Sequence, residues 1–487
     1  MIYDAAVIGG GVTGASVLWH LSHYECKAVL LEKCCDGALG ISKANSGIVH
    51  GGFHHPVTSL KAKLEVKGIP MFDALQKELH FPFHRCGIVV AAFTEEELAS
   101  CRKLFEQGKA NGIGNLQWHT GESLRTLEPL LAENVLGGFV APDGGVIEPT
   151  AYGMRLLESA RLNGADLCFD TKVEKGEYID GVWHLQIAGR PDVIKARYVV
   201  NAAGLFADEV SRAFGAEEFR IVPRKGEEYL LDRESRAKPQ RVLFPAPSKH
   251  SKGVLVIPTA GGTTMIGPTA DMVESKDDTA TSAENFRKIL SLVQKIVPAV
   301  TQKDVISSFA GLRPVMENED FYIAPSEKVP CFIQAAGIQS PGLTASPAVG
   351  EYITDLLKTA GLSLTEKTAE RVMLTSLPEI RNLTDEETDR LYQENRKVTS
   401  YVCRCEKITE AEIIEAVRHG HTTLDGVKFY TRAGMGRCQG GFCQARIMEI
   451  ISRESGIPLE ELTKKGGASY LLAGRLGSLK VKEMKHD

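Results

Sequence analysis

The sequence predicts a protein of the α/β and α+β classes, with a doubly wound nucleotide-binding domain, an antiparallel-sheet substrate domain and a small helical C-terminal domain. Three observations support this prediction. A short apolar strand enters a glycine-rich turn and a helix near the N-terminus, strands and helices then alternate without a repeat, and two close pairs of cysteines lie near the C-terminus. The length of 487 residues is enough for roughly three domains of average size.

Composition excludes several classes of protein. Hydrophobic residues make up 43% of the chain and charged residues 24%, which is typical of a globular protein with a large core. A net charge of −5 gives no basic footprint, so we expect no nucleic-acid partner. There is neither a signal-peptide pattern nor an apolar run of about 18 residues, so we expect no membrane span, and peripheral association through a partner stays open. Eleven cysteines without a secretory signal favour reduced thiols and a cytoplasmic location.

The N-terminal motif is a glycine fingerprint inside a β-α-β unit. A strand at 5–8 leads into the turn, a helix follows, and a second strand at 28–31 ends at Glu32. The motif contains three glycines: Gly9, Gly11 and Gly14. The first permits the tight turn, the second lets the backbone approach a pyrophosphate, and the third lets the helix pack closely on the strand. Glu32 can accept hydrogen bonds from ribose hydroxyls, so the pattern predicts a Rossmann-like dinucleotide site, for NAD or for FAD.

The middle of the chain predicts further strands and helices. Strands are expected at Cys168–Val173, Trp183–Ile187, Tyr198–Val200, Val254–Ile257 and Thr263–Ile266. Helices are expected at Glu284–Ile296 and, after Pro347, at Ala348–Thr359. Near the C-terminus, Thr409 and Glu412 form the pattern of a capping box that opens a helix, which His419-Gly420 closes.

Several segments resemble flavoproteins of the D-amino-acid-oxidase-like superfamily. The run Asn45-Ser-Gly-Ile-Val-His-Gly-Gly52, followed by Ser59–Leu64, is similar to the L-2-hydroxyglutarate and FAD-dependent glycerol-3-phosphate dehydrogenase families. Further matches are Val199–Gly204, Lys225–Tyr229, Ala310–Pro314 and Gly337–Thr344. The resemblance covers roughly residues 1–360 and implies that the dinucleotide is FAD.

The resemblance also implies which residues contact the cofactor. Small residues let the backbone approach a flat ring, and backbone N–H groups stabilise negative charge on a reduced flavin. Besides the three motif glycines and Glu32, the implied FAD-binding residues are Asn45, Ser46, Gly47, Val173, Gly204, Gly337, Ser340, Gly342, Leu343 and Thr344. Val173 is placed against the adenine.

Two residues are candidates for catalysis. Arg313 resembles the family's anion clamp, and a guanidinium suits a carboxylate or a phosphate equally well, although a structural ion pair is the alternative. His50 could act as the base for a substrate hydroxyl because imidazole titrates near neutral pH, although a buried core histidine is nearly as consistent with its position. His54 and Lys225 are weaker candidates for contacts to an anion.

The C-terminal cysteines predict a metal centre. The four thiols are Cys403, Cys405, Cys438 and Cys443. Sulfur-only ligation suits iron–sulfur or zinc, and the one-residue gap in the first pair is less suited to zinc. The segment, including Thr431–Gly436, resembles the bacterioferritin-associated-ferredoxin-like [2Fe–2S] module. A flavoprotein body joined to this module is similar to the anaerobic glycerol-3-phosphate dehydrogenase large-subunit family.

These matches give the expected domains. FAD-binding pieces are expected at about 1–80, 145–220 and 305–360, substrate-domain pieces at about 81–144 and 221–304, a linker at 361–399, the [2Fe–2S] domain at 400–460 and a tail at 461–487. The linker is expected because aromatic residues become scarce and charges rise there.

The resemblance implies an FAD-dependent dehydrogenase of an anionic secondary alcohol. The leading reaction oxidises sn-glycerol 3-phosphate to dihydroxyacetone phosphate, and electrons leave through the [2Fe–2S] cluster to a partner subunit or carrier. L-2-hydroxyglutarate, or another 2-hydroxy or amino acid, is the second choice. Phe53-His54-His55 disfavours hydroxyglutarate, because those enzymes tend to have a tyrosine pair there. An electron-transfer subunit of a larger flavoprotein complex is the remaining alternative, and an intact Arg313 argues against it.

Overall fold

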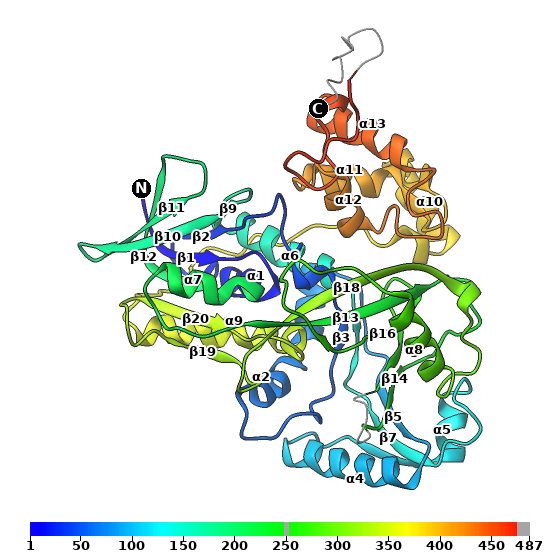
Figure 1. Cartoon of the computed structure of the whole chain (residues 1–487). Coiled ribbons are helices and arrows are strands. Elements are labelled where there is room, and N and C mark those ends of the chain that lie inside the picture. Colours follow the sequence, from blue (N-terminus) through cyan, green and yellow to red (C-terminus); the bar gives the residue numbers. More distant parts are fainter. Residues whose placement is uncertain (248–252, 475–487) are drawn as a thin grey trace, which may run out of the picture. The chain divides into compact units, whose positions relative to one another are not determined.

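The computed structural model describes residues 1–247 and 253–474 of the chain. The chain divides into two compact units, Met1–Leu374 and Thr375–Asp487 (Figure 1). Within the described ranges, no helix combines the length and the apolar character that crossing a membrane requires. The eleven cysteines are free thiols.

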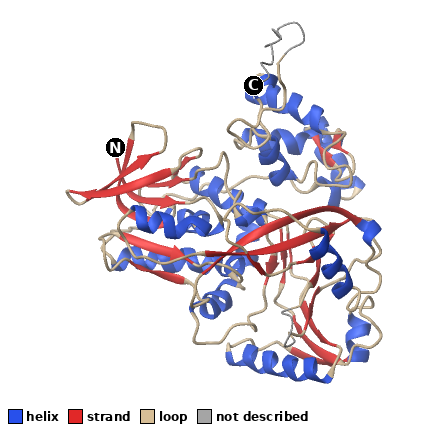
Figure 2. Ribbon diagram, in the orientation of Figure 1, coloured by secondary structure: helices blue, strands red, loops and turns tan. Residues whose placement is uncertain are grey.

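The first sheet of the N-terminal unit has eight strands and is parallel at its centre (Figure 2). Its strands are β1 Ile2–Ile8, β2 Ala28–Leu31, β9 Asp166–Cys168, β10 Val173–Ile179, β11 Val182–Ile187, β12 Val193–Asn201, β19 Tyr322–Pro325 and β20 Phe332–Ala336. β1 lies between β2 and β12, while β9 pairs with β2 and β20 with the end of β12, all in parallel. β10, β11 and β19 pair in antiparallel fashion.

Helices cover both faces of this sheet. The helices are α1 Val12–Leu21, α6 Pro149–Leu162, α7 Ala207–Ala213 and α9 Gly342–Thr359. Ala5 and Val7 of β1 share a core with α1, α6 and α9. Ala6 and Ile8 point to the opposite face and share a core with the α7 region. A strand buried on both faces reads as a continuous apolar run, which is what β1 shows. The predicted doubly wound α/β architecture is therefore confirmed.

The second sheet has nine strands and is antiparallel except where β14 pairs with β5. Its strands are β5 Ile88–Ala92, β6 Gln117–Thr120, β7 Gly137–Ala141, β13 Val222–Leu231, β14 Val242–Pro245, β15 Leu255–Pro258, β16 Thr264–Gly267, β17 Asp271–Met272 and β18 Val305–Val315. Helices α4 Glu95–Ala110, α5 Gly121–Leu127 and α8 Ala283–Val293 pack against this sheet. β18 pairs with β13 along its whole length, so 305–315 belongs to this sheet and not to the nucleotide-binding piece expected at 305–360.

A small third sheet joins distant segments of the N-terminal unit. It consists of β3 Ile48–Val49, β4 Phe83–His84 and β8 Gly145–Ile147, with β8 in the middle. Helices α2 Leu60–Gly68 and α3 Met71–Leu79 lie between β3 and β4 in sequence. Because β3 and β8 are antiparallel, the pairing of Ile48 with Val146 brings the segment before β3 beside the start of α6, and Ile147 N donates to Gly47 O at 2.8 Å.

Two expected elements differ from the structure. Cys168–Val173 is not one strand, because Asp170 adopts a left-handed conformation (φ 48°) that separates β9 from β10. The helix expected to begin after Pro347 begins at Gly342 instead. Proline in a helix removes a hydrogen bond to the carbonyl four residues earlier. Here that carbonyl, on Leu343, accepts a hydrogen bond from Ser346 Oγ at 2.8 Å, so the helix continues through Pro347.

The expected linker at 361–399 is not a free connection. Its first part is attached to the N-terminal unit, where Glu25 N donates to Thr365 O at 2.8 Å and Arg371 pairs with Glu78 at 2.7 Å. The part after residue 374 belongs to the C-terminal unit, where Ile380 is buried in a core with Val398. The charged segment is therefore mostly irregular chain held by such contacts, and its one α-helix, Asp385–Glu394, has no buried residue.

The C-terminal unit is a cluster of short helices. Its elements are α10 Asp385–Glu394, β21 Tyr401–Cys403, β22 Ile408–Thr409, α11 Glu410–Arg418, α12 Leu424–Thr431 and α13 Gln444–Ser455. Thr409 and Glu412 form the predicted capping box, and His419 is the C-cap of α11. α13 ends at Gly456, whose φ of 76° favours glycine.

We predict that Gly350→Ala destabilises the N-terminal unit. Gly350 lies where α9 crosses α1, and a Cβ there would lie 2.5 Å from Ser16 Oγ and 2.8 Å from the Ser16 carbonyl carbon. Overpacking of this kind costs about 1–3 kcal/mol, more than the gain of about 1 kcal/mol that alanine brings to a helix. Chemical denaturation would measure the loss. Gly114→Ala is the control, because no atom lies within 4 Å of its Cβ position. Equal stability of the two variants would contradict the close packing.

Candidate functional site

The glycine turn is sterically closed to larger residues. Gly9 has a φ of 110°, and a Cβ there would overlap the Ala202 carbonyl oxygen. A Cβ at Gly14 would overlap the Gly9 carbonyl oxygen, so the third glycine does permit the close approach of α1 to the turn. A Cβ at Gly11 would lie 3.2 Å from Ser42 Oγ. The turn therefore presents backbone to a ligand at the carboxyl end of β1, although contact with FAD stays a prediction.

Glu32 lies beside this turn at the end of β2. Its Oε2 accepts a hydrogen bond from Gly10 N at 2.5 Å, and its Oε1 accepts one from Cys34 N at 2.8 Å. Ser42 Oγ accepts from Val12 N at 3.0 Å, so a serine hydroxyl binds the first N–H of α1. Sequence reasoning missed the role of Ser42, since nothing local indicates which helix it caps.

The loop that leads into β3 is closed by Asn45, and β3 itself is joined to the start of α9 by Thr344. Asn45 holds its loop closed, because its Nδ2 donates to Ser42 O at 2.7 Å and its Oδ1 accepts from Gly47 N at 2.9 Å. Thr344 connects α9 to β3, because its Oγ1 accepts from His50 N at 2.9 Å and donates to Ile48 O at 3.3 Å. The N-terminus of α9 is thus attached directly to the strand that precedes His50.

His50 is half-buried and partnered. Its Nε2 lies 3.2 Å from Ser340 Oγ, and its ring centroid lies 5.9 Å from those of His54 and Phe244. Burial lowers the pKa of His50 to about 3, with smaller contributions from His54 and His55. The imidazole is therefore neutral at physiological pH, and in this environment it holds a proton less tightly than a free imidazole does.

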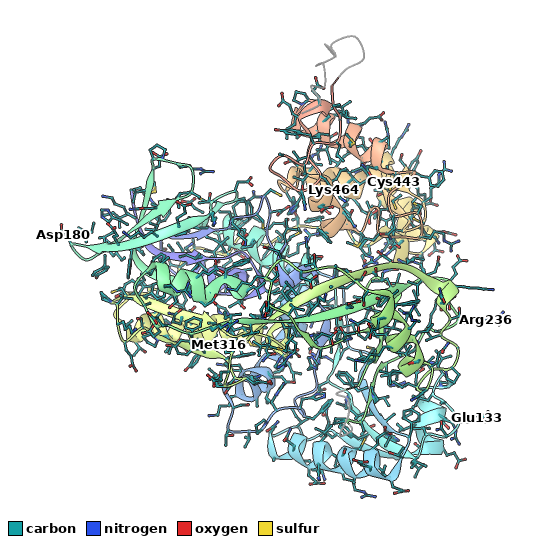
Figure 3. The ribbon with its side chains drawn as sticks, viewed as in Figure 1. Glu133, Asp180, Arg236, Met316, Cys443 and Lys464 are labelled. Carbon is teal, nitrogen blue, oxygen red and sulfur yellow. The ribbon has the colours of Figure 1, made fainter. Side chains whose placement is uncertain are left out.

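Of the other predicted cofactor residues, Gly204 and Gly337 have positive φ angles. Gly204 has a φ of 56° and no atom within 4 Å of its Cβ position. Gly337 has a φ of 65°, and a Cβ there would lie 2.9 Å from the sulfur of Met316, which Figure 3 labels. Val173 opens β10 and packs in the core that contains β2. Gly342 and Leu343 open α9, with Leu343 against the main core.

Arg313 lies on β18 in a nearly closed environment. Its Nη1 donates to Thr269 O at 3.2 Å, and a Cβ at Gly226 would lie 2.6 Å from its Nη2. Burial lowers the pKa of Arg313, while Glu228 raises it. Lys225 pairs with Asp278 at 2.9 Å. The guanidinium therefore lies flat over Gly226 of the Lys225–Tyr229 motif. Its charge also lowers the pKa of Glu228, a buried residue that the sequence analysis did not single out.

Four thiols meet in the C-terminal unit. Sγ of Cys405 lies 3.9 Å from that of Cys403 and 3.8 Å from that of Cys438, and Cys403 is hydrogen-bonded to Cys443. That bond raises the pKa of Cys403 and lowers that of Cys443. Cys443 precedes α13 and is labelled in Figure 3.

The four thiols form one group of neighbours, because Cys443 also interacts electrostatically with Cys405 and Cys438. Within the described residues, no three His, Cys, Asp or Glu side chains are arranged to hold a single metal ion. Four cysteine thiolates are the ligand set of a [2Fe–2S] cluster. Gly434 N donates to Cys403 Sγ at 3.4 Å, which is a contact that stabilises thiolate charge in such clusters. A Cβ at Gly436 would lie 2.5 Å from Cys405 Sγ, so the loop needs glycine there.

A buried ion triad supports the thiol loop. Glu406 follows Cys405 directly, and its side chain is 1% exposed. It pairs with Arg432 at 3.3 Å and with Arg381 at 3.6 Å, and both arginine side chains are also buried. Sequence reasoning missed Arg381 because it lies in the segment expected to be a linker. Removing one member of a buried ion group leaves an uncompensated charge, so the triad constrains the loop that carries Cys405.

A dinucleotide-type turn in one unit and four neighbouring thiols in the other are typical of oxidoreductases with two redox groups. The chain belongs to the FAD dependent oxidoreductase family, which matches residues 4–356. The BFD-like [2Fe-2S] binding domain matches residues 401–453, a range that contains all four cysteines. The cofactors are therefore FAD and a [2Fe–2S] cluster, as the resemblance implied.

Known relatives agree with this assignment. A glycerol 3-phosphate dehydrogenase of Caloramator mitchellensis is 37% identical over 475 residues, which is 97% of this chain and 98% of the relative. A glycerol 3-phosphate oxidase of Mycoplasma genitalium is 29% identical and covers 73% of this chain and 94% of its own length. The FAD-bound L-α-glycerophosphate oxidase structure from Mycoplasma pneumoniae has a TM-score of 0.73 at 28% identity and covers 77% of this chain and 100% of its own. The chain is therefore a glycerol-3-phosphate dehydrogenase-like FAD oxidoreductase.

We predict that Cys403→Ser and Cys438→Ser each abolish the iron–sulfur spectrum. Metal binding couples to folding in small domains, so protease should also cut residues 375–460 faster in these variants. The flavin should remain bound and reducible, because every candidate FAD residue lies in the N-terminal unit. Cys331→Ser, outside the cluster segment, is the control. Stoichiometric zinc without iron or acid-labile sulfide in anaerobically purified protein would contradict the electron-transfer role.

Proposed function

We propose that this chain oxidises sn-glycerol 3-phosphate to dihydroxyacetone phosphate. The observation that carries the proposal is the match to a glycerol 3-phosphate dehydrogenase over 97% of the chain, which extends through the cluster domain. Matches to L-2-hydroxyglutarate dehydrogenases, such as the human enzyme at 24% identity, cover 72% of the chain. Arg313 favours a substrate that carries an anionic group. The relative that matches over the full length, a glycerol 3-phosphate dehydrogenase, favours phosphate as that group.

Arg313 and His50 have complementary roles in this proposal. The Arg313 guanidinium binds the substrate phosphate, since a buried fork of N–H donors holds two oxygens of an anion at once. His50 Nε2 accepts the proton of the substrate hydroxyl as the alcohol becomes a ketone. A neutral imidazole is required for that step, and burial keeps His50 neutral. Ser340 Oγ, 3.2 Å from Nε2, orients the ring until substrate arrives.

The remaining residues position the cofactor. FAD, when bound, supplies the two-electron acceptor for the alcohol, and the [2Fe–2S] cluster supplies a one-electron path out. The glycine turn holds the pyrophosphate, Glu32 holds the ribose, and the segments at 45–47 and 337–344 hold the flavin ring. Cys403, Cys405, Cys438 and Cys443 are the proposed cluster ligands. A protein subunit or carrier takes the electrons, and we propose that it meets the chain in the cytoplasm.

A dye-reduction screen tests the proposal directly. Purified enzyme would be offered sn-glycerol 3-phosphate, L-2-hydroxyglutarate, lactate and proline with an artificial electron acceptor. We expect kcat/KM to be highest for glycerol 3-phosphate. Faster turnover of L-2-hydroxyglutarate would indicate that the site binds a carboxylate and not a phosphate. Reduction by none of them, with FAD present, would favour the electron-transfer subunit instead.

We predict that Arg313→Ala lowers kcat/KM for glycerol 3-phosphate while FAD stays bound. Truncating one side of a buried charge-assisted contact typically costs about 2–5 kcal/mol, which corresponds to a loss of roughly 30-fold or more. Flavin absorbance would verify cofactor content. Arg197→Ala is the control, because Arg197 is 53% exposed and pairs with Asp4 at the surface. Unchanged efficiency of Arg313→Ala on every anionic substrate would exclude the anion-binding role.

A further inference from the structure

Glu228 is a buried carboxylate that no assigned role uses. Glu228 is 2% exposed to solvent. Ser46 Oγ donates a hydrogen bond to its Oε1, and its Oε2 has no hydrogen-bond partner among the described residues. Burying an unpaired carboxylate oxygen is costly, so its retention at this position calls for a reason.

The neighbouring glutamate shows the contrast. Glu227 is also fully buried but points to the other face of β13. Its Oε2 accepts from Tyr229 Oη at 3.0 Å and from Ser282 N at 2.8 Å, and its Oε1 accepts from Asn285 Nδ2 at 2.8 Å. Glu227 is thus satisfied as a structural residue, whereas Glu228 is satisfied at one oxygen only.

Strand register places Glu228 on the same face of the second sheet as Arg313. β13 pairs with β18 so that Gly226 lies opposite Gly311 and Arg224 opposite Arg313, and alternate residues share a face. A Cβ at Gly311 would overlap the Ala44 carbonyl oxygen, so this face meets the segment that carries Ser46. Glu228 therefore lies between the proposed flavin-binding loop and the proposed anion-binding arginine.

The charges around Glu228 are few. Arg313 of β18 is the charged group that acts on it, and Ser46 is its hydrogen-bond donor. From β16, Gly267 approaches it through backbone. The other nearby cations of β13 are paired elsewhere, Arg224 with Glu319 at 2.6 Å and Lys225 with Asp278 at 2.9 Å.

We propose that Glu228 balances the charge of Arg313 in the empty site and takes up one proton when a dianionic substrate binds. The proton comes from solvent. Each enzyme molecule whose Glu228 is ionised takes up one proton when it binds one dianion. Glu228 is then a positioning residue, since it acts through Arg313 and Ser46 and touches no reacting atom. The proposal rests on the proposed function for the identity of the dianion, but the charge exchange requires only a dianion beside Arg313.

The physical chemistry of the site supports this exchange. Burial raises the pKa of Glu228 to about 7, against the opposing effects of Ser46 and Arg313. A dianion that arrives on the shared arginine adds negative charge and favours the neutral carboxyl further. Above pH 7 the carboxylate must therefore be protonated before or as the anion binds, and affinity falls as pH rises. His50, with a pKa of about 3, does not titrate in that range.

Sulfate is the probe that isolates the protein's proton, because it remains a dianion throughout this pH range whereas a phosphate gains a proton near pH 6. FAD-loaded enzyme would be titrated with sulfate between pH 7 and 9, with flavin absorbance as the signal. We expect the Kd of wild type to rise toward tenfold per pH unit above pH 7.5, and dilute buffer with an indicator to report about one proton taken up at pH 8. In Glu228→Gln, the Kd should be flat with pH and lower than that of wild type at pH 9.

Glu412→Gln is the matched control. Glu412 is a carboxyl whose pKa burial also raises to about 7, but it lies in the C-terminal unit, and glutamine preserves its capping box. This variant should keep the wild-type slope. A flat wild-type profile, an unchanged slope in Glu228→Gln, or no sulfate binding at any pH would each overturn the proposal. Proton uptake is measured on the wild type, so it does not depend on whether a variant folds. Sulfate binding does not require turnover. Failure of the dye screen would therefore contradict the proposed substrate without contradicting the role of Glu228.

Discussion

Crowding of backbone at the carboxyl end of β1 determines how the flavin-binding body is assembled. The contacts of Gly9 with Ala202, and of Gly14 with Gly9, leave no room for a Cβ. α1 therefore starts directly against the ends of β1 and β12, and its partner α9 crosses it at Gly350, where a Cβ would again collide. Because α9 is fixed to α1 in this way, its N-terminus reaches the strand before His50 through Thr344. One set of glycine contacts thus leads from the nucleotide turn to the proposed catalytic base.

Both units bury charge next to the proposed redox groups, and they do so differently. In the N-terminal unit, Arg313 and Glu228 act on one another at a site proposed to admit an anion, so one carboxylate oxygen is left without a partner. In the C-terminal unit, Glu406 is enclosed by Arg381 and Arg432 and supports a loop of cluster cysteines. Removing one member of a buried ion group leaves an uncompensated charge, so each of these groups constrains the segment that carries it.

Local patterns predicted what local chemistry determines. The glycine turn, the capping box at Thr409 and the pairing of cysteine segments were all readable, because each depends on residues close in sequence or on one ligand type. Glu228 was not readable, since its environment arises from the register of β13 with β18 and from Ser46 of a distant loop. Arg381 was missed for a related reason, because a charged segment with few aromatic residues is typical of a linker. The start of α9 before Pro347 depends on a compensating serine bond that propensity alone does not reveal.

The division of the chain separates the two kinds of electron chemistry by residue. Every candidate FAD and substrate residue lies before Leu374, and all four candidate cluster ligands lie after Thr375. The two sites share no side chain among these candidates, so a change in one leaves the chemistry of the other intact. A flavin site built on a two-faced parallel sheet tolerates an open approach for substrate at the carboxyl edge. The four thiols are held by glycine-containing loops and a buried ion triad, and they need no opening for a substrate. A compact helical unit is therefore sufficient to hold them.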